Sequence, residues 1–115
     1  MAHFLLQWTY KDTAIQAMLD HPQERGRELC KAVEAFGGQV HQFFFAFGAY
    51  DGIAIVEFPD NESCAACSLT LEGAGANSAL TTTVLLSPKE GYRAMQKANQ
   101  TRSGYRPPVG YGSHG

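Results

Sequence analysis

The sequence lacks the features that mark several large classes of protein. Its nine lysine and arginine residues form no cluster, and the formal net charge is −2. Nucleic-acid binding is therefore not expected, because it needs grouped cations that neutralise phosphates. No apolar run approaches the length of about 18 residues that would suggest a membrane span. No basic segment precedes an apolar core at the N-terminus, so no secretory signal is visible. We expect neither a nucleic acid nor a membrane as a partner.

Cysteine is also scarce. The chain has three cysteines, an odd number with no sign of a disulfide framework, which favours a reducing, cytoplasmic location. Cys64-Ala65-Ala66-Cys67 has redox spacing. However, a helix cap at Asp60 would place Cys64 about one turn too far into its helix for the dipole to stabilise a thiolate. We interpret Cys64 and Cys67 as small core residues.

The residues that are present fit one α+β domain. The length of 115 residues and the apolar content of 44% suit a single core. A larger pocket would have to form between subunits. Segments with the composition of strands are residues 2–10, 39–47, 52–58 and 80–86. Residues 11–20 are expected to form a connection with some helical character.

Three helices are expected among these strands. His21-Pro22 is predicted to open the first helix and Gly37-Gly38 to end it. Asp60 is predicted to cap the second helix. Ser87-Pro88-Lys89-Glu90 has the pattern of a capping box and predicts a third helix, at the C-terminal end of the domain.

The resulting order, β-α-β-β-α-β followed by a helix, predicts a ferredoxin-like fold. Right-handed crossovers would place the first and third strands at the centre and both main helices on one face. The second and third strands are apolar on both sides, so the sheet face without helices would also be apolar. Because large exposed apolar patches are rare, we expect another apolar surface to pack against that face. The sheet of another copy is the economical candidate, which predicts a homodimer or a higher homo-oligomer.

The end of the chain differs from the rest in composition. The periodic pattern of apolar residues stops near Asn99, and the remaining residues are rich in glycine, proline and tyrosine. We therefore expect a folded domain over residues 1–99 and a flexible tail over residues 100–115.

A tight reversal between two apolar strands carries the most informative motif, Gly48-Ala49-Tyr50-Asp51. Gly48, Tyr50 and Asp51 match the motif of the GYD-domain family, which the chain resembles over about residues 3 to 95. The supporting similarities are Trp8-Thr9, Pro22, Arg25, Gly37-Gly38, Glu57-x-Pro59-Asp60 and Thr81-Thr82-Thr83.

The resemblance implies a ferredoxin-like fold of the dimeric α+β barrel superfamily and a dimer formed sheet to sheet. It brings no established reaction. The sequence departs from the family at Gly52, where an apolar residue is usual, and this departure is expected to loosen the start of the third strand.

Three residues are candidates for acid–base catalysis: His41, Tyr50 and Asp51. Tyr50 and Asp51 would form a general acid and base at the mouth of a cleft, although a neighbouring carboxylate raises the pKa of a tyrosine. The alternative is structural, with Asp51 accepting hydrogen bonds in the turn and Tyr50 packing on the sheet. His41 suits a base because the pKa of histidine lies near neutrality. It is expected on the same side of its strand as Phe43 and Phe45, bordering one pocket with Tyr50 and Asp51.

A metal site and a cofactor are not expected. His3 is a second histidine, but within one subunit the third strand would separate it from His41, and no convincing third ligand is present. The candidates for ligand binding are Trp8, Arg25, Phe43 and Phe45. The aromatic residues would line an apolar cavity, and Arg25 would bind an anion or, alternatively, pair with Glu28 or Asp20.

These features favour a small homo-oligomeric protein that binds a small apolar molecule in a cavity. Two alternatives stay open. One is an enzyme, monooxygenase-like or isomerase-like, that acts on a small hydrophobic substrate by acid–base chemistry. The other is a structural subunit of an assembly. The sequence does not decide whether the protein is an enzyme.

Overall fold

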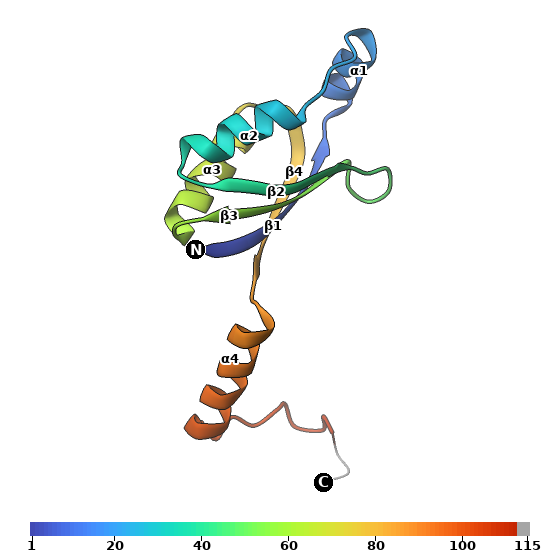
Figure 1. Ribbon diagram of the computed structural model, residues 1–115. Coiled ribbons are helices and arrows are strands. Elements are labelled where there is room, and N and C mark those ends of the chain that lie inside the picture. The colour runs from blue at the N-terminus through green and yellow to red at the C-terminus, as the bar shows by residue number, and fades with distance from the viewer. Residues whose placement is uncertain (113–115) are drawn as a thin grey trace. The chain divides into compact units, whose positions relative to one another are not determined.

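The computed structural model describes residues 1–112 (Figure 1). Its contacts divide the chain into two units, Met1–Leu85 and the part from Leu86 onward. The first unit holds a sheet with three helices, and the second holds the last helix. Each unit is described by itself below.

Four strands form one antiparallel sheet in the first unit. They are β1 (Ala2–Tyr10), β2 (Gln39–Phe45), β3 (Gly52–Phe58) and β4 (Asn77–Leu85). Their order across the sheet is β2-β3-β1-β4, so β1 and β3 are central, as predicted. This is the ferredoxin-like arrangement.

The bounds of two strands, β2 and β4, differ from the prediction. β2 ends at Phe45 rather than residue 47, because Ala46 N turns to donate a 2.8 Å hydrogen bond to Asp51 O across the reversal. β4 begins at Asn77, before the predicted start at residue 80, because the chain already pairs there with Tyr10 of β1.

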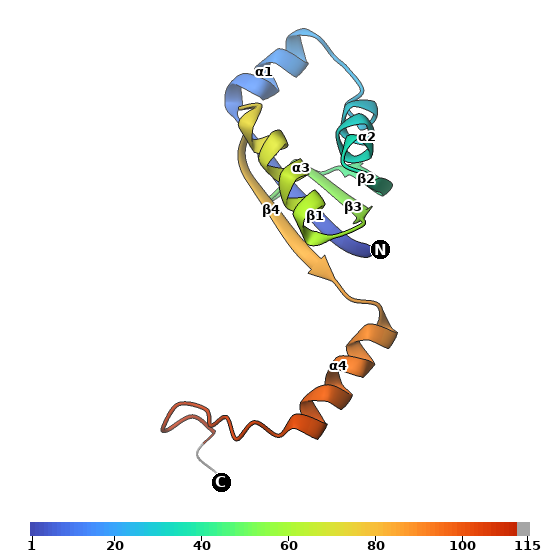
Figure 2. The same ribbon diagram turned by 90° about the vertical axis from the view of Figure 1, so that its left-hand side faces the viewer.

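Helices α2 (Gly26–Ala35) and α3 (Asn61–Gly73) lie over the same face of the sheet (Figure 2). Asp60 caps α3 as predicted, since its Oδ1 accepts a 2.8 Å hydrogen bond from Ser63 N. Gly37 ends the α2 turn with a φ of 78°, a left-handed conformation that glycine tolerates at low cost. We call the face under these two helices the covered face.

The predicted start of the first helix was wrong. α2 begins at Gly26 and not at Pro22, and His21 has a non-helical backbone, which fits the steric restriction that a proline places on the residue before it. Residues 12–20 form a separate helix, α1 (Asp12–Asp20), which has no buried residue.

The core lies between the covered face and the two helices. Its strand residues alternate along the central strands, as a half-buried sheet requires. The buried members are Phe4, Leu6, Trp8, Leu29, Val33, Ala54, Val56, Phe58, Cys64 and Cys67. The burial of Cys64 and Cys67 in the core agrees with their interpretation as small core residues.

The other face of the sheet carries no helix of the unit formed by residues 1–85 (Figure 2). We call it the open face. Its apolar residues follow from the strand register and are partly or fully exposed: Leu5, Phe44, Ile53, Ile55 and Leu85. The same face also carries His3 and Glu57, which are direct cross-strand partners.

The second unit contains α4 (Pro88–Thr101), which begins with the predicted capping box between Ser87 and Glu90. Beyond it, no helix or strand occurs among residues 102–112. The predicted division at residue 99 and the flexibility of the tail stay predictions, and the last three tail residues lie outside the described part of the chain. No helix over residues 1–112 combines the length and the apolar character that crossing a membrane requires.

Candidate functional site

The Gly48–Asp51 motif lies in the reversal between β2 and β3, and its aspartate is held by backbone contacts. Asp51 Oδ2 accepts a 2.9 Å hydrogen bond from Tyr10 N. Asp51 N donates to Trp8 O at 2.8 Å. These bonds join the reversal to the end of β1, whereas the structural alternative for Asp51 expected bonds within the turn itself. Tyr50 is half-buried.

Gly52 follows the motif and lies directly beneath the indole of Trp8. A Cβ added at Gly52 would lie 2.3 Å from two ring carbons of Trp8. Gly52 is itself buried and begins β3 in register with Trp8. The absence of a side chain at Gly52 therefore leaves space for the ring of Trp8. The sequence analysis did not predict this contact.

A pocket with a volume of about 100 Å³ opens on the covered face, beside Trp8. Its apolar lining comes from the sheet and from the two helices above it: Trp8, Leu29, Phe43, Leu71 and Leu80. Its polar lining is Tyr10, Arg25, Glu28 and Asn77. An apolar surface with a few polar groups is the usual composition of a small-molecule site.

The polar groups of this pocket differ in their partners. Arg25 Nη1 donates a 3.2 Å hydrogen bond to Gln23 Oε1, and Arg25 forms no ion pair within residues 1–112. The predicted alternative, pairing with Glu28 or Asp20, is not seen. Glu28 instead pairs with Lys31 at 3.3 Å. Asn77 Oδ1 is buried and accepts no hydrogen bond from the described residues.

Three of the four residues predicted to bind a ligand line this pocket: Trp8, Arg25 and Phe43. The fourth, Phe45, contacts Phe43 edge-on with ring centroids 5.6 Å apart. Phe43 in turn packs on Trp8 at 5.5 Å. The aromatic side chains thus form a continuous row from the pocket to the end of β2. Whether they bind a ligand stays a prediction.

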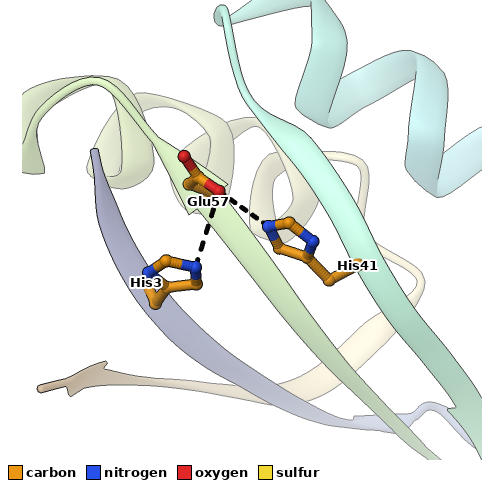
Figure 3. A group of neighbouring side chains, drawn as sticks. All are labelled: His3, His41 and Glu57. Atoms are coloured by element: carbon orange, nitrogen blue, oxygen red, sulfur yellow. Dashed lines mark hydrogen bonds and ion pairs between the residues drawn. The ribbon is translucent and has the colours of Figure 1, made fainter. Parts of the chain in front are cut away.

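A second candidate site lies on the open face, where the side chains of His3, His41 and Glu57 converge from β1, β2 and β3 (Figure 3). Glu57 Oε1 is 2.7 Å from His41 Nε2 and 3.5 Å from His3 Nε2. The two imidazole rings are nearly parallel, with centroids 5.3 Å apart. One carboxylate oxygen therefore faces both Nε2 atoms.

The histidines hold Glu57 in its ionised form. The hydrogen bond from His41 is the largest cause that lowers the pKa of Glu57 below its ordinary value of 4.5. Partial burial opposes this shift, and the positive charges of His3, His41 and the N-terminus add to it. A carboxylate that accepts hydrogen bonds in its charged form is expected to show this direction.

A β-bulge in β2 explains why the sequence analysis placed His41 wrongly. Val40 pairs with Val56 and Gln42 with Ile55, which leaves His41 as an extra residue. An extra residue shifts the alternation of side chains between the two faces. Phe43 therefore lies on the covered face, while His41 reaches Glu57 on the open face. His41 does not share a side with Phe43 and Phe45, contrary to the prediction.

The structure does not bring the three catalytic candidates together. His41 lies beside Glu57 at the end of β3, whereas Asp51 precedes the start of that strand. The intervening residues span about 20 Å of extended chain. Glu57 is a candidate site residue that the sequence reasoning did not identify. The sequence does single it out, because Glu57 is the only charged residue of β3, a strand that is otherwise apolar.

Cys64 and Cys67 do not have the properties of reactive thiolates. Cys64 and Cys67 are free and buried on α3. Burial raises the pKa of Cys64, and burial followed by the neighbouring Cys64 raises the pKa of Cys67 to about 11. Both groups are therefore protonated near neutral pH, whereas reactive cysteines have a lowered pKa.

Comparison with solved structures finds the same fold in other proteins. The chain matches MtbAldR with a TM-score of 0.55 and 21% identity, over 75% of this chain and 53% of that one. It matches TTHA0845 from Thermus thermophilus with a TM-score of 0.52 and 17% identity, over 76% and 95%. It matches FFRP-DM1 with a TM-score of 0.50 and 14% identity, over 75% and 100%. The chain thus spans about half the length of MtbAldR.

These likenesses show the fold alone. The architecture is α+β and ferredoxin-like, as the sequence predicted. No curated protein matches the chain significantly. The model of the GYD domain matches residues 4–95, which is most of the chain. The protein therefore belongs to the GYD domain family.

Proposed function

We propose that the protein binds a small apolar carboxylate in the pocket beside Trp8. The observation that carries this proposal is the pairing of an apolar lining with Arg25, a guanidinium that has no carboxylate partner within residues 1–112. A guanidinium binds a carboxylate through two parallel hydrogen bonds. The pocket would thus hold the tail of the ligand against Trp8 and Phe43 while Arg25 holds its head.

The size of the pocket limits the ligand. A volume of about 100 Å³ is smaller than an engineered cavity of about 150 Å³ that admits benzene. The ligand is accordingly a short branched or compact cyclic acid. Asn77 Oδ1 would accept a hydrogen bond from a hydroxyl or amino group on such a molecule. Glu28 is the one acidic group in the lining, and its pairing with Lys31 reduces its repulsion of an anion.

Trp8 provides a direct measurement, because it is the only tryptophan of the chain and lines the pocket. We would titrate short branched and cyclic monocarboxylates into the protein and record tryptophan fluorescence. Binding should change the emission, and Arg25→Gln should weaken binding roughly tenfold or more, since a charge-assisted hydrogen bond is lost.

Arg27→Gln is the matched control, because Arg27 is exposed on the same helix and does not line the pocket. It should leave the affinity unchanged. The proposal fails if no acid in the set changes the fluorescence. It also fails if Arg25→Gln and Arg27→Gln bind equally well.

We also propose that two copies associate through their open faces. The apolar side chains of that face, among them Phe44 and Ile55, are unlike the surface of a typical monomer. A sheet face of this kind can bury the area that a stable interface needs. The role of the protein would then be that of a homodimeric binding protein.

Sedimentation velocity at micromolar concentration tests this association. The unmodified protein should sediment as a dimer, and Ile55→Lys should convert it to a monomer because the new charge would have to be buried. Leu69→Lys is the control, since Leu69 is an exposed residue of α3, and it should leave the dimer intact. A monomeric unmodified protein would overturn the proposal.

A further inference from the structure

We propose that His3, His41 and Glu57 form a binding site for a divalent transition-metal ion, with zinc as its representative. Two imidazole nitrogens and one carboxylate oxygen are a donor set that zinc binds well, with distances of about 2.0–2.2 Å from metal to ligand. The three donor atoms all lie within 4.8 Å of one another. They come from three adjacent strands, so the backbone of the sheet fixes their relative positions (Figure 3).

The separations between the donor atoms are near those found around one shared ion, and all of them are within 4.8 Å. Donors at these distances from a metal stand about 3.0–3.4 Å apart in octahedral or tetrahedral coordination. Glu57 Oε1 is 3.5 Å from His3 Nε2, close to the upper end of this range. The 2.7 Å contact with His41 Nε2 is a hydrogen bond, and a small rotation of His41 would open it to the same range. The histidine side chains are 48% and 36% exposed, which leaves room for that rotation.

The β-bulge at His41 sets up the site. It turns Phe43 into the core while His41 stays on the open face, next to the cross-strand pair of His3 and Glu57. Bulges commonly re-aim a side chain at functional sites. The site is therefore built into the sheet.

Only three protein donors converge, whereas a closed structural zinc site has four. The site lies at the end of the open face, where β1 begins and β3 ends, and the association of open faces proposed above must leave that end accessible. The remaining coordination positions would then point away from the sheet. A water molecule or an anion would occupy them. The bound metal would therefore keep at least one ligand that can exchange with solvent.

The experiment uses the full chain without a histidine tag, made metal-free by dialysis against a chelator. Isothermal titration with zinc should show one ion per chain. The cobalt(II) form should show visible absorption bands typical of coordination by three protein donors, and azide should shift these bands by entering the exchangeable position. A cobalt spectrum that azide leaves unchanged would overturn the open coordination position.

Two variants and one control locate the binding. His41→Gln and Glu57→Gln should each weaken zinc binding tenfold or more, the loss expected when a ligand is removed. His21→Gln should bind zinc like the unmodified chain, because His21 follows α1 and is not part of the cluster. Far-ultraviolet circular dichroism would establish that each variant is folded.

A second measurement keeps the proposal testable if a variant does not fold. The chain has four histidines, and zinc should shift the imidazole NMR signals of His3 and His41 in the unmodified protein while that of His21 stays in place. Absence of zinc binding, or binding that survives both glutamine variants, would overturn the site. Neither result would affect the proposed carboxylate pocket, which lies on the opposite face of the sheet.

Discussion

The two faces of the sheet differ in the side chains that pack against them. The covered face is filled by side chains of α2 and α3 and contains no buried charged residue. The open face mixes apolar side chains with a carboxylate and two histidines that interact mainly with one another. The packing that stabilises the fold is therefore concentrated on the covered face, while the open face is the one to which we assign association and metal binding as proposals.

The largest effect should come from a matched pair of phenylalanines, one on each face. Phe58 is 0% exposed and Phe44 is 59% exposed. Phe58→Ala should lower the free energy of unfolding by about 3–5 kcal/mol, because it leaves a cavity in the core. Phe44→Ala should lower it by less than about 1 kcal/mol in the monomer. Urea denaturation measures both, and similar losses would remove the distinction between the faces.

A smaller effect is expected from glycines at the two ends of the same reversal. Gly52→Ala should cost about 1–3 kcal/mol of stability, because the new methyl group would overlap the ring of Trp8. It should also change the emission of Trp8. Gly48→Ala is the control, since nothing lies within 4 Å of its added Cβ. Equal stability of the two variants would show that Trp8 moves away without cost.

The aspartate of the motif should have a still smaller effect. Asp51→Ala removes the acceptor of the hydrogen bond from Tyr10 N and should cost roughly 1–2 kcal/mol. Asp51→Asn keeps an acceptor and should recover most of that loss. Thermal unfolding monitored by circular dichroism gives the comparison. If Asp51→Asn instead left stability intact and abolished ligand binding, Asp51 would have a functional role beyond the turn.

The covered face could be predicted from the sequence far better than the open one. Alternation of apolar residues along Phe4, Leu6 and Trp8, together with the cap at Asp60, predicted the central strand, the helix that follows β3 and the core between them. These signals are local, and local periodicity is the strongest that a single sequence carries.

The site on the open face depends on how distant strands pair, which the local sequence pattern does not determine. The bulge at His41 results from pairing between β2 and β3, and a one-residue change of register moves side chains to the other face. Likewise, Glu57 contacts His3 only because the two residues are paired in the register between β1 and β3.

The pocket on the covered face could be predicted in part. Its aromatic residues and Arg25 were recognisable by their chemical type, whereas Asn77 and Leu71 were not.

The smallest expected effect is the dependence of stability on pH that Glu57 adds to the open face. Because the pKa of Glu57 is lowered on folding, its contribution is present above the ordinary value of 4.5 and is lost as the pH falls through the lower value of the folded protein. The unmodified protein should therefore lose stability more steeply below pH 4.5 than Glu57→Gln does. Urea denaturation at several pH values, with a chelator present to exclude metal, measures this difference.

Asp60 does not confound this comparison, although the hydrogen bonds from Ser63 also lower its pKa. Asp60 is unchanged in Glu57→Gln, so its contribution is the same in both proteins and cancels in the difference. Since Glu57 lies at the surface with the histidines, solvent screens the interaction and the difference should be small. Parallel pH profiles of the two proteins would show that the contacts of Glu57 with His3 and His41 add nothing to folding, and that the cluster is held in place by the strands alone.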